Sequence, residues 1–70
     1  MKYRDFERIL LANGFEFVRQ KGSHRHFRGY PGGKMALVTL SSPGGDDIRP
    51  GTLKSMIRQS ELPERLFQSR

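Results

Sequence analysis

The sequence predicts a small α+β domain in which two helices cover one face of a three-stranded antiparallel sheet. Apolar residues recur at helical spacing near both ends of the chain, and three short strand-like runs separated by turn-forming residues lie between them. Seventy residues make one domain, residues 1–70, with a thin core, because so short a chain buries only about 60% of its unfolded surface. We therefore expect any chemistry to lie on a surface.

The first element is a helix over residues 3–12. Tyr3, Phe6 and Leu10 fall on one side at helical spacing, which is typical of an amphipathic helix that packs on a core. The Asn-Gly pair at 13–14 indicates where the helix ends, because glycine readily takes the left-handed conformation that follows many helix C-termini.

A tight hairpin is predicted at Gly22-Ser23, between an alternating run over residues 15–21 and a second over residues 24–28. Glycine at the first position of a two-residue loop favours a type II′ turn, which needs a positive φ there. A loop of this length fixes the cross-strand pairs, which are Lys21–His24, Gln20–Arg25, Arg19–His26, Val18–Phe27 and Phe17–Arg28.

Directly opposed residues lie on the same side of an antiparallel sheet, so this pairing divides the hairpin into two faces. One face carries Val18 and Phe27, which we expect to be buried. The other is a basic face with two imidazoles and with Phe17 at its far end; its polar members are Arg19, Lys21, His24, His26 and Arg28. A four-residue loop would leave these faces unchanged, whereas a one-residue bulge would exchange them.

The third strand covers residues 35–40 and follows a reversal at residues 30–33. Its alternate residues Ala36, Val38 and Leu40 share one side, which we expect to face the helices. Short connections between the three strands indicate an antiparallel meander.

A loop over residues 41–47 leads to the second helix, residues 50–59, in which proline suits the first turn. Its apolar stripe consists of Leu53, Met56 and Ile57. Lys54 and Arg58, four residues apart, lie along another side of this helix. A short helix over residues 64–68 follows. Because a three-stranded sheet with one polar face can bury only its other face, both helices must cover the same side.

The charge distribution favours a polyanionic partner. The net charge is +6, from 13 Lys and Arg against 7 Asp and Glu, and residues 19–28 hold four cationic side chains and no acidic one. This clustering favours nucleic acid over a membrane, and it is also compatible with an acidic partner protein. The absence of cysteine excludes disulfides, thiolate nucleophiles and Cys-ligated zinc. We expect no signal peptide and a cytoplasmic location, and no apolar run approaches the roughly 20 residues of a membrane span.

Three ordered motifs resemble the HicA toxin family. They are Asn13-Gly14-Phe15 after the first helix, Arg19-Gln20-Lys21-Gly22-Ser23-His24 at the hairpin, and Pro50-Gly51-Thr52-Leu53 at the start of the second helix. The tripeptide Gly-Ser-His recurs by chance, but the ordered set is much more specific and covers essentially the whole chain. Members are small ribonucleases of type II toxin–antitoxin pairs. Their double-stranded-RNA-binding-domain-like fold has the α-β-β-β-α order that the pattern also predicts.

The resemblance implies cleavage of messenger RNA and inhibition by a HicB-type antitoxin. His24 matches the family's catalytic histidine. We expect the toxin alone to be a monomer that forms a larger complex with the antitoxin. The chain departs from the family at one place, because many members carry Pro-x-His just after the third strand, where this sequence reads Leu40-Ser41-Ser42-Pro43-Gly44-Gly45. The missing histidine argues against a mechanism that takes a second imidazole from this loop, and it leaves open a specialised or less active variant.

The residue types on the basic face suit metal-independent RNA cleavage. In that reaction the 2′-hydroxyl of the RNA is the nucleophile, so the enzyme supplies a proton acceptor, a proton donor and cations for the phosphate. Histidine suits both transfers, because its unperturbed pKa of about 6.5 lies near working pH. We assign the key acid/base to His24 and expect Lys21 to hold the scissile phosphate, with Arg19 and Arg28 on neighbouring phosphates. His26 is a second proton-transfer group or a substrate contact. The Lys54/Arg58 side of the second helix is either a solvated face or a second RNA contact.

The remaining residues of the hairpin receive lesser roles. Ser23 contacts RNA from the turn and is not expected to be a nucleophile, since no Ser-His-acid set is evident, and Gly22 is structural. His24 and His26 make no convincing metal site without cysteines and with the aspartates at 46–47 on a distant loop, so we expect no metal and no cofactor. Two alternatives stay open. One is a non-catalytic RNA-binding module that uses the same basic face, and the other is a domain that meets only an acidic protein.

Overall fold

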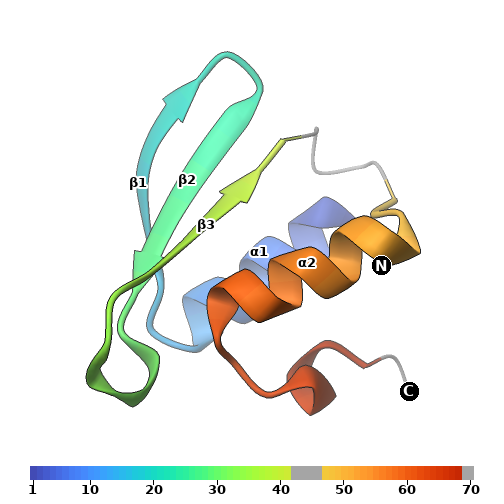
Figure 1. The fold of residues 1–70 in the computed structure, drawn as a ribbon. Helices are drawn as coiled ribbons and strands as arrows, with labels where there is room; N and C mark the ends of the chain where they lie inside the picture. Colours follow the sequence, from blue (N-terminus) through green and yellow to red (C-terminus); the bar gives the residue numbers. More distant parts are fainter. Residues whose placement is uncertain (42–46, 69–70) are drawn as a thin grey trace.

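The computed structural model describes residues 1–41 and 47–68. Their order is helix, three strands, helix, followed by a short helical turn (Figure 1). The elements are α1 Tyr3–Ala12, β1 Glu16–Lys21, β2 His24–Gly29, η1 Pro31–Gly33, β3 Ala36–Leu40, α2 Pro50–Ser60 and η2 Glu64–Phe67. The predicted α+β class and its double-stranded-RNA-binding-domain-like order are confirmed, and the terminal helix is a 3₁₀ turn. Residues 42–46, which include most of the predicted loop and Pro43, lie outside the described residues.

The molecule has two layers. The strands pair in the order β1-β2-β3 with both pairings antiparallel, and α1 and α2 lie together on one side of the sheet (Figure 1). We call the other side of the sheet the open face; no described helix covers it. The prediction that both helices share one side is therefore confirmed.

The core fills the space between the layers. Phe6 and Leu10 of α1 are fully buried, and the Phe6 ring stacks on Phe67 of η2 with centroids 4.5 Å apart. The sheet contributes the side chains that alternate toward the helices, namely Phe27, Ala36, Val38 and Leu40. Burying each large apolar side chain stabilises the fold by roughly 1.5–3 kcal/mol, so these residues account for much of a small core.

The hairpin turn has the predicted geometry. Gly22 has φ 60° and Ser23 has no positive φ, which is the type II′ pattern. The Gln20 amide donates a hydrogen bond of 2.9 Å to the Gly22 carbonyl and braces the turn. The three predicted pairs next to the turn are confirmed; they are Lys21–His24, Gln20–Arg25 and Arg19–His26.

Farther from the turn, a β-bulge at Val18 shifts the register, so the predicted Val18–Phe27 and Phe17–Arg28 pairs are wrong. Phe27 pairs with Phe17, and Arg28 pairs with Glu16. Phe17 therefore lies beside Phe27 instead of on the open face, with its ring edge-on at 5.7 Å, while Val18 stays 43% exposed. The bulge keeps the polar hairpin residues on the open face and brings two aromatic rings together, a contact worth about 0.5–1.5 kcal/mol.

Two contacts fix β2 to the rest of the molecule. The Arg25 guanidinium lies on the helix-facing side, 3.1 Å from the Glu7 carboxylate of α1 and 4.8 Å from the Phe17 ring centroid. At the other end of β2, a Cβ on Gly29 would lie 2.6 Å from the Phe15 ring, so only glycine lets that ring pack beneath the strand. These contacts fix the helix-facing side of β2, the central strand, whose other side belongs to the open face.

Candidate functional site

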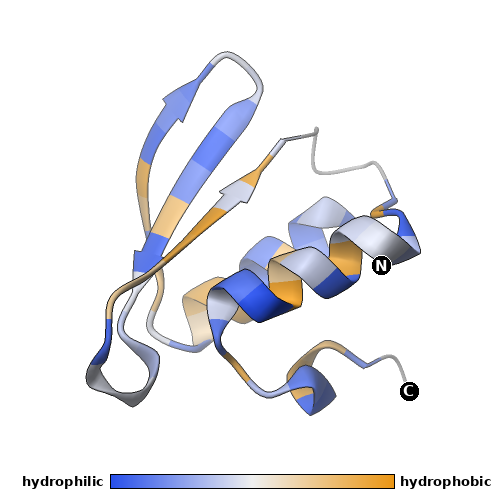
Figure 2. Ribbon diagram, in the orientation of Figure 1, coloured by the Kyte–Doolittle hydropathy of each residue, from blue (hydrophilic) through white to orange (hydrophobic). Residues whose placement is uncertain are grey.

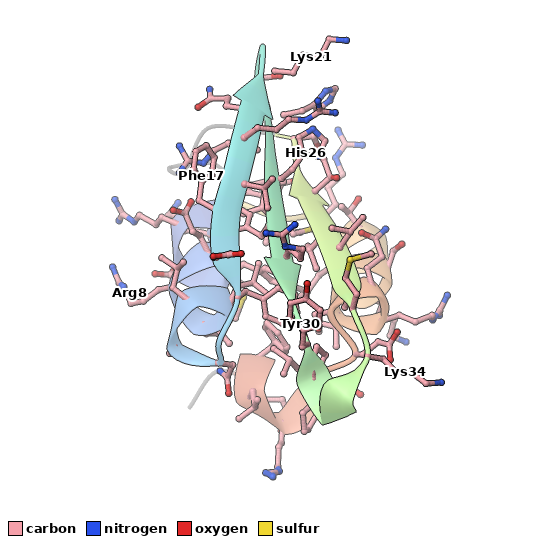
Figure 3. The ribbon with its side chains drawn as sticks, turned by 90° about the vertical axis from the view of Figure 1, so that its left-hand side faces the viewer. Arg8, Phe17, Lys21, His26, Tyr30 and Lys34 are labelled. Atoms are coloured by element: carbon pink, nitrogen blue, oxygen red, sulfur yellow. The ribbon has the colours of Figure 1, made fainter. Side chains whose placement is uncertain are left out.

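The open face takes side chains from all three strands. Because residues alternate, it carries every second residue of β2 together with their partners on the neighbouring strands. Its members are Glu16, Arg19 and Lys21 of β1, His24, His26 and Arg28 of β2, and Leu37 and Thr39 of β3. Figure 3 looks onto this face, with Lys21 and His26 toward the hairpin tip. Figure 2 shows that hydrophilic residues dominate the hairpin half of β1 and β2.

Two neighbouring cross-strand pairs form a cation–imidazole cluster, which consists of Lys21, His24, Arg19 and His26. Lys21 faces His24 beside the turn, and Arg19 faces His26 in the next pair toward the bulge. Facing Cα atoms in such pairs lie about 4.5–5.5 Å apart, and the two histidines, two residues apart along β2, are about 7 Å apart at Cα. Each imidazole is thus next to a cation, and the ring of His24 is open to solvent.

His26 is more constrained than His24. It is half-buried, and its Nδ1 lies 3.1 Å from the Thr39 hydroxyl of β3, its Cα partner on that strand. This hydrogen bond orients the ring and leaves Nε2 for a ligand. Sequence reasoning missed Thr39, although the alternation that assigned Ala36, Val38 and Leu40 to the helices already placed it on the open face.

Arg28 lies on the open face as predicted, but its guanidinium is already engaged. It donates a hydrogen bond of 2.8 Å to the Glu16 carboxylate. This bond raises the pKa of Arg28, and the nearby Tyr30 hydroxyl and the Glu16 charge raise it further. Glu16 could not be found from the sequence, because the bulge at Val18 is what brings it opposite Arg28.

The turn residues lie at the edge of the cluster. Gly22 and Ser23 are both exposed, and Ser23 immediately precedes His24 at the hairpin tip. The tip projects beyond the helix layer (Figure 1), so a long polymer can approach the cluster without meeting α1 or α2.

Lys54 and Arg58 are not brought together with this cluster. They belong to α2 in the helix layer, on the other side of the sheet from the open face (Figure 1). Together with Ile57 and Glu64 they line a surface pocket of about 280 Å³. Any anion that they hold is therefore bound at a separate place.

Two further surveys concern only residues 1–41 and 47–68. Within them, His, Asp and Glu side chains form no group of three that could hold a metal ion. None of the helices that they form combines the length and the apolar character needed to cross a membrane.

Comparison with known proteins agrees with the motifs and the fold. The family model described as "HicA toxin of bacterial toxin-antitoxin" matches residues 3–62, from the start of α1 to just beyond α2. The chain belongs to the HicA toxin family. It is 36% identical over 64 residues to the "Probable mRNA interferase HicA" of Pseudomonas fluorescens (strain Pf0-1), an alignment that covers 91% of this chain and all of that protein. No solved structure matches significantly. This HicA-family chain is thus the toxin component of a toxin–antitoxin system.

Proposed function

We propose that this HicA-family toxin is a metal-independent endoribonuclease that cleaves messenger RNA, with His24 as its key acid/base. The observation that carries the proposal is the cation–imidazole cluster, in which an exposed imidazole stands opposite Lys21 on a face that no described helix covers. The name of the Pseudomonas fluorescens relative, a probable mRNA interferase, supports the same class of reaction.

The reaction that fits this cluster is an internal transesterification. The 2′-hydroxyl oxygen attacks the adjacent phosphorus and loses its proton to a base, and the bond between phosphorus and the 5′-oxygen breaks as that oxygen receives a proton. Cations beside the phosphate stabilise the charge that develops on its oxygens. The products are a 2′,3′-cyclic phosphate and a 5′-hydroxyl, so no metal-bound water is needed.

In this proposal each member of the cluster has a role. His24 moves a proton, and Lys21 opposite it binds the scissile phosphate. Arg19 holds a neighbouring phosphate, and His26, oriented by Thr39, contacts the RNA or supplies the second proton transfer through Nε2. Ser23 contacts the RNA from the turn. Arg28 contributes less charge to the RNA than the other cations, because Glu16 already accepts its hydrogen bond.

Lys54 and Arg58 offer a second phosphate contact on the helix layer. RNA must leave the open face and pass around the molecule to reach them. We expect them to matter only for long substrates.

The inhibitor in this proposal is a HicB-type antitoxin that covers the open face of a monomeric toxin and forms a larger complex with it. The net charge of +6 and the concentration of cations on one face favour an acidic partner. Masking a surface that must bind RNA blocks the activity without any change in the toxin's fold.

Expression in cells tests the proposal. Wild-type protein is expected to arrest growth and to leave RNA fragments that end in 2′,3′-cyclic phosphate and begin with 5′-hydroxyl. His24→Ala is expected to do neither while still binding RNA. With purified protein, Lys54→Ala is expected to cleave a short RNA almost as the wild type does. A non-catalytic RNA-binding module would instead leave RNA intact in both the wild type and His24→Ala. Cleavage by His24→Ala that leaves the same ends would show that His24 is not the acid/base.

A further inference from the structure

The end of the open face farthest from the hairpin carries an apolar patch that the proposed chemistry does not use. It consists of Tyr30, Met35 and Leu37, which are 59%, 55% and 56% exposed. Leu37 pairs with Arg28 across β2 and β3 and therefore lies on the open face, and Met35 directly precedes β3 at the same end of the sheet. Tyr30 directly follows β2, and Figure 3 shows it at the other end of the sheet from Lys21.

Two cations border this patch. Arg28, two residues before Tyr30 along the chain, stands directly opposite Leu37, and its guanidinium lies near the phenol end of Tyr30. Lys34 is exposed at the same end (Figure 3), and within residues 1–41 and 47–68 it forms no ion pair. An exposed aromatic ring between cations is the arrangement that proteins use to hold single-stranded nucleic acid, with bases on the ring and phosphates on the cations.

We propose that Tyr30 is a stacking platform for an unpaired nucleobase of the RNA substrate, with Met35 and Leu37 as the apolar floor beside it. The inference rests on the proposed function, because it takes RNA to be the ligand of the open face. Tyr30 is six positions after His24 along nearly continuous strand, a separation of about 20 Å. The stacked base is therefore several nucleotides away from the cleaved bond, and it sets where the RNA lies on the sheet.

The charges on this face favour RNA over a protein as the ligand of Tyr30. A row of cations runs along the face from the cluster through Arg28 to Lys34. Among the described cross-strand pairs, Glu16 is the one carboxylate on this face, and it is already bound to Arg28. A phosphate backbone that starts at the cluster passes Arg28, whose charge Glu16 partly offsets, and reaches Lys34, while its bases need an apolar surface at that end. A strand edge or a purely apolar patch would fit a protein partner equally well; a cation-lined path that ends at an aromatic ring fits RNA better.

Binding of a non-cleavable oligonucleotide tests the proposal. The probe is a single-stranded RNA whose 2′-hydroxyls are replaced by 2′-O-methyl groups, which removes the nucleophile, and the dissociation constant is measured by fluorescence anisotropy. Tyr30→Ala is expected to weaken binding roughly 5- to 100-fold, the range that loss of one stacked base gives. Tyr30→Phe keeps the ring and is expected to bind as wild type. Leu11→Ala, which removes a side chain 48% exposed on α1, is the matched control and is expected to change nothing.

An abasic nucleotide makes the test specific for stacking. The base is removed at one position at a time along the oligonucleotide, and one position is expected to weaken binding to the wild type by the same factor as Tyr30→Ala. At that position the abasic probe should bind wild type and Tyr30→Ala equally, because the contact is already lost. The inference would be overturned if Tyr30→Ala bound the oligonucleotide as tightly as the wild type does. It would also be overturned if, at every position, removing the base weakened binding to Tyr30→Ala as much as binding to the wild type. Unchanged RNA affinity together with lost inhibition by an antitoxin would overturn it as well and would assign the patch to the partner protein.

The outcomes separate this inference from the proposed catalysis. If His24→Ala still cleaves RNA while Tyr30→Ala loses the stacked base, the acid/base assignment fails and the platform stands. If Tyr30→Ala binds and cleaves as wild type while His24→Ala is inactive, the platform fails and the catalytic assignment stands. A wild-type protein that binds no RNA contradicts both.

Discussion

The two faces of β2 carry different tasks within one six-residue strand. Toward the helices, Arg25 contacts Glu7, Phe27 is fully buried and Gly29 admits the Phe15 ring. Toward solvent, His24, His26 and Arg28 lie on the open face and contact no helix residue through a described hydrogen bond or ion pair. The difference teaches that substitutions on the helix-facing side should change stability, whereas those on the open face should change RNA binding and cleavage.

The strongest contrast between the two faces is expected at Phe27. Phe27→Ala leaves a large cavity beside Val38 and Leu40 and is expected to cost about 3–5 kcal/mol of unfolding free energy. That is a large share of the stability of so short a chain. The neighbouring His26→Ala is expected to cost about 1 kcal/mol or less, because it removes a single exposed hydrogen bond to Thr39. Urea unfolding followed by circular dichroism measures both, and equal losses would contradict the division of faces.

Two glycines give a contrast of opposite sign. Gly29→Ala would put a methyl group 2.6 Å from the Phe15 ring and is expected to destabilise the protein by about 1–3 kcal/mol. Gly51→Ala, in the first turn of α2, meets no atom within 4 Å and is expected to stabilise the protein by up to about 1 kcal/mol, because alanine favours the helix. Thermal unfolding of the two variants side by side tests this. A stabilising Gly29→Ala would mean that the ring does not pack beneath β2.

The next contrast is between two arginines of the hairpin. Arg25→Ala breaks the contacts with Glu7 and the Phe17 ring and is expected to cost about 1 kcal/mol of stability, a modest loss because both charged side chains are partly exposed. Arg19→Ala is expected to leave stability unchanged and to reduce the salt dependence of RNA binding by about one counterion. Binding titrations at several salt concentrations, paired with unfolding curves, separate the two effects. The division of roles between the faces would be contradicted if Arg19→Ala lowered stability and Arg25→Ala changed the salt dependence of RNA binding.

The smallest expected effect concerns the ion pair on the open face. The hydrogen bond to Glu16 raises the pKa of Arg28, so the guanidinium stays charged at every working pH and contributes no pH dependence to activity or to stability below about pH 12. Glu16→Gln removes the competing carboxylate charge and is expected to strengthen RNA binding a few-fold and to steepen its salt dependence. Arg8→Gln, a charge change on α1, is the control. Weaker RNA binding by Glu16→Gln would show that Glu16 positions Arg28 for the substrate.

Much of this arrangement could be predicted from the sequence. Helical spacing gave α1 and α2, Gly-Ser gave the type II′ turn, and the turn in turn gave the Lys21–His24 and Arg19–His26 pairs. Each of these depends on a local signal, namely periodicity or a residue that tolerates positive φ. The face of His24 could be predicted because His24 directly follows the turn that sets the register.

The predictions that were wrong or missing depend on contacts between residues that are far apart in the sequence. The alternation of residues in β1 gives no sign of the bulge at Val18. The shifted register is favoured by the contacts that it allows between Phe17 and the side chains of Phe27 and Arg25. The Glu16–Arg28 ion pair follows from the same shift and was therefore missed as well. Lys54 and Arg58 line one pocket beside α2, but only the packing of the layers shows that α2 lies on the other side of the sheet from the open face.

The most direct test of the central claim measures cleavage and stability on the same purified His24→Ala protein. His24 is exposed on the open face, so its unfolding free energy is expected to stay within about 0.5 kcal/mol of wild type. Its single-turnover cleavage rate is expected to fall roughly 100- to 10,000-fold, the contribution of one positioned acid or base. A cleavage rate within a few-fold of wild type in a fully folded variant would contradict the account.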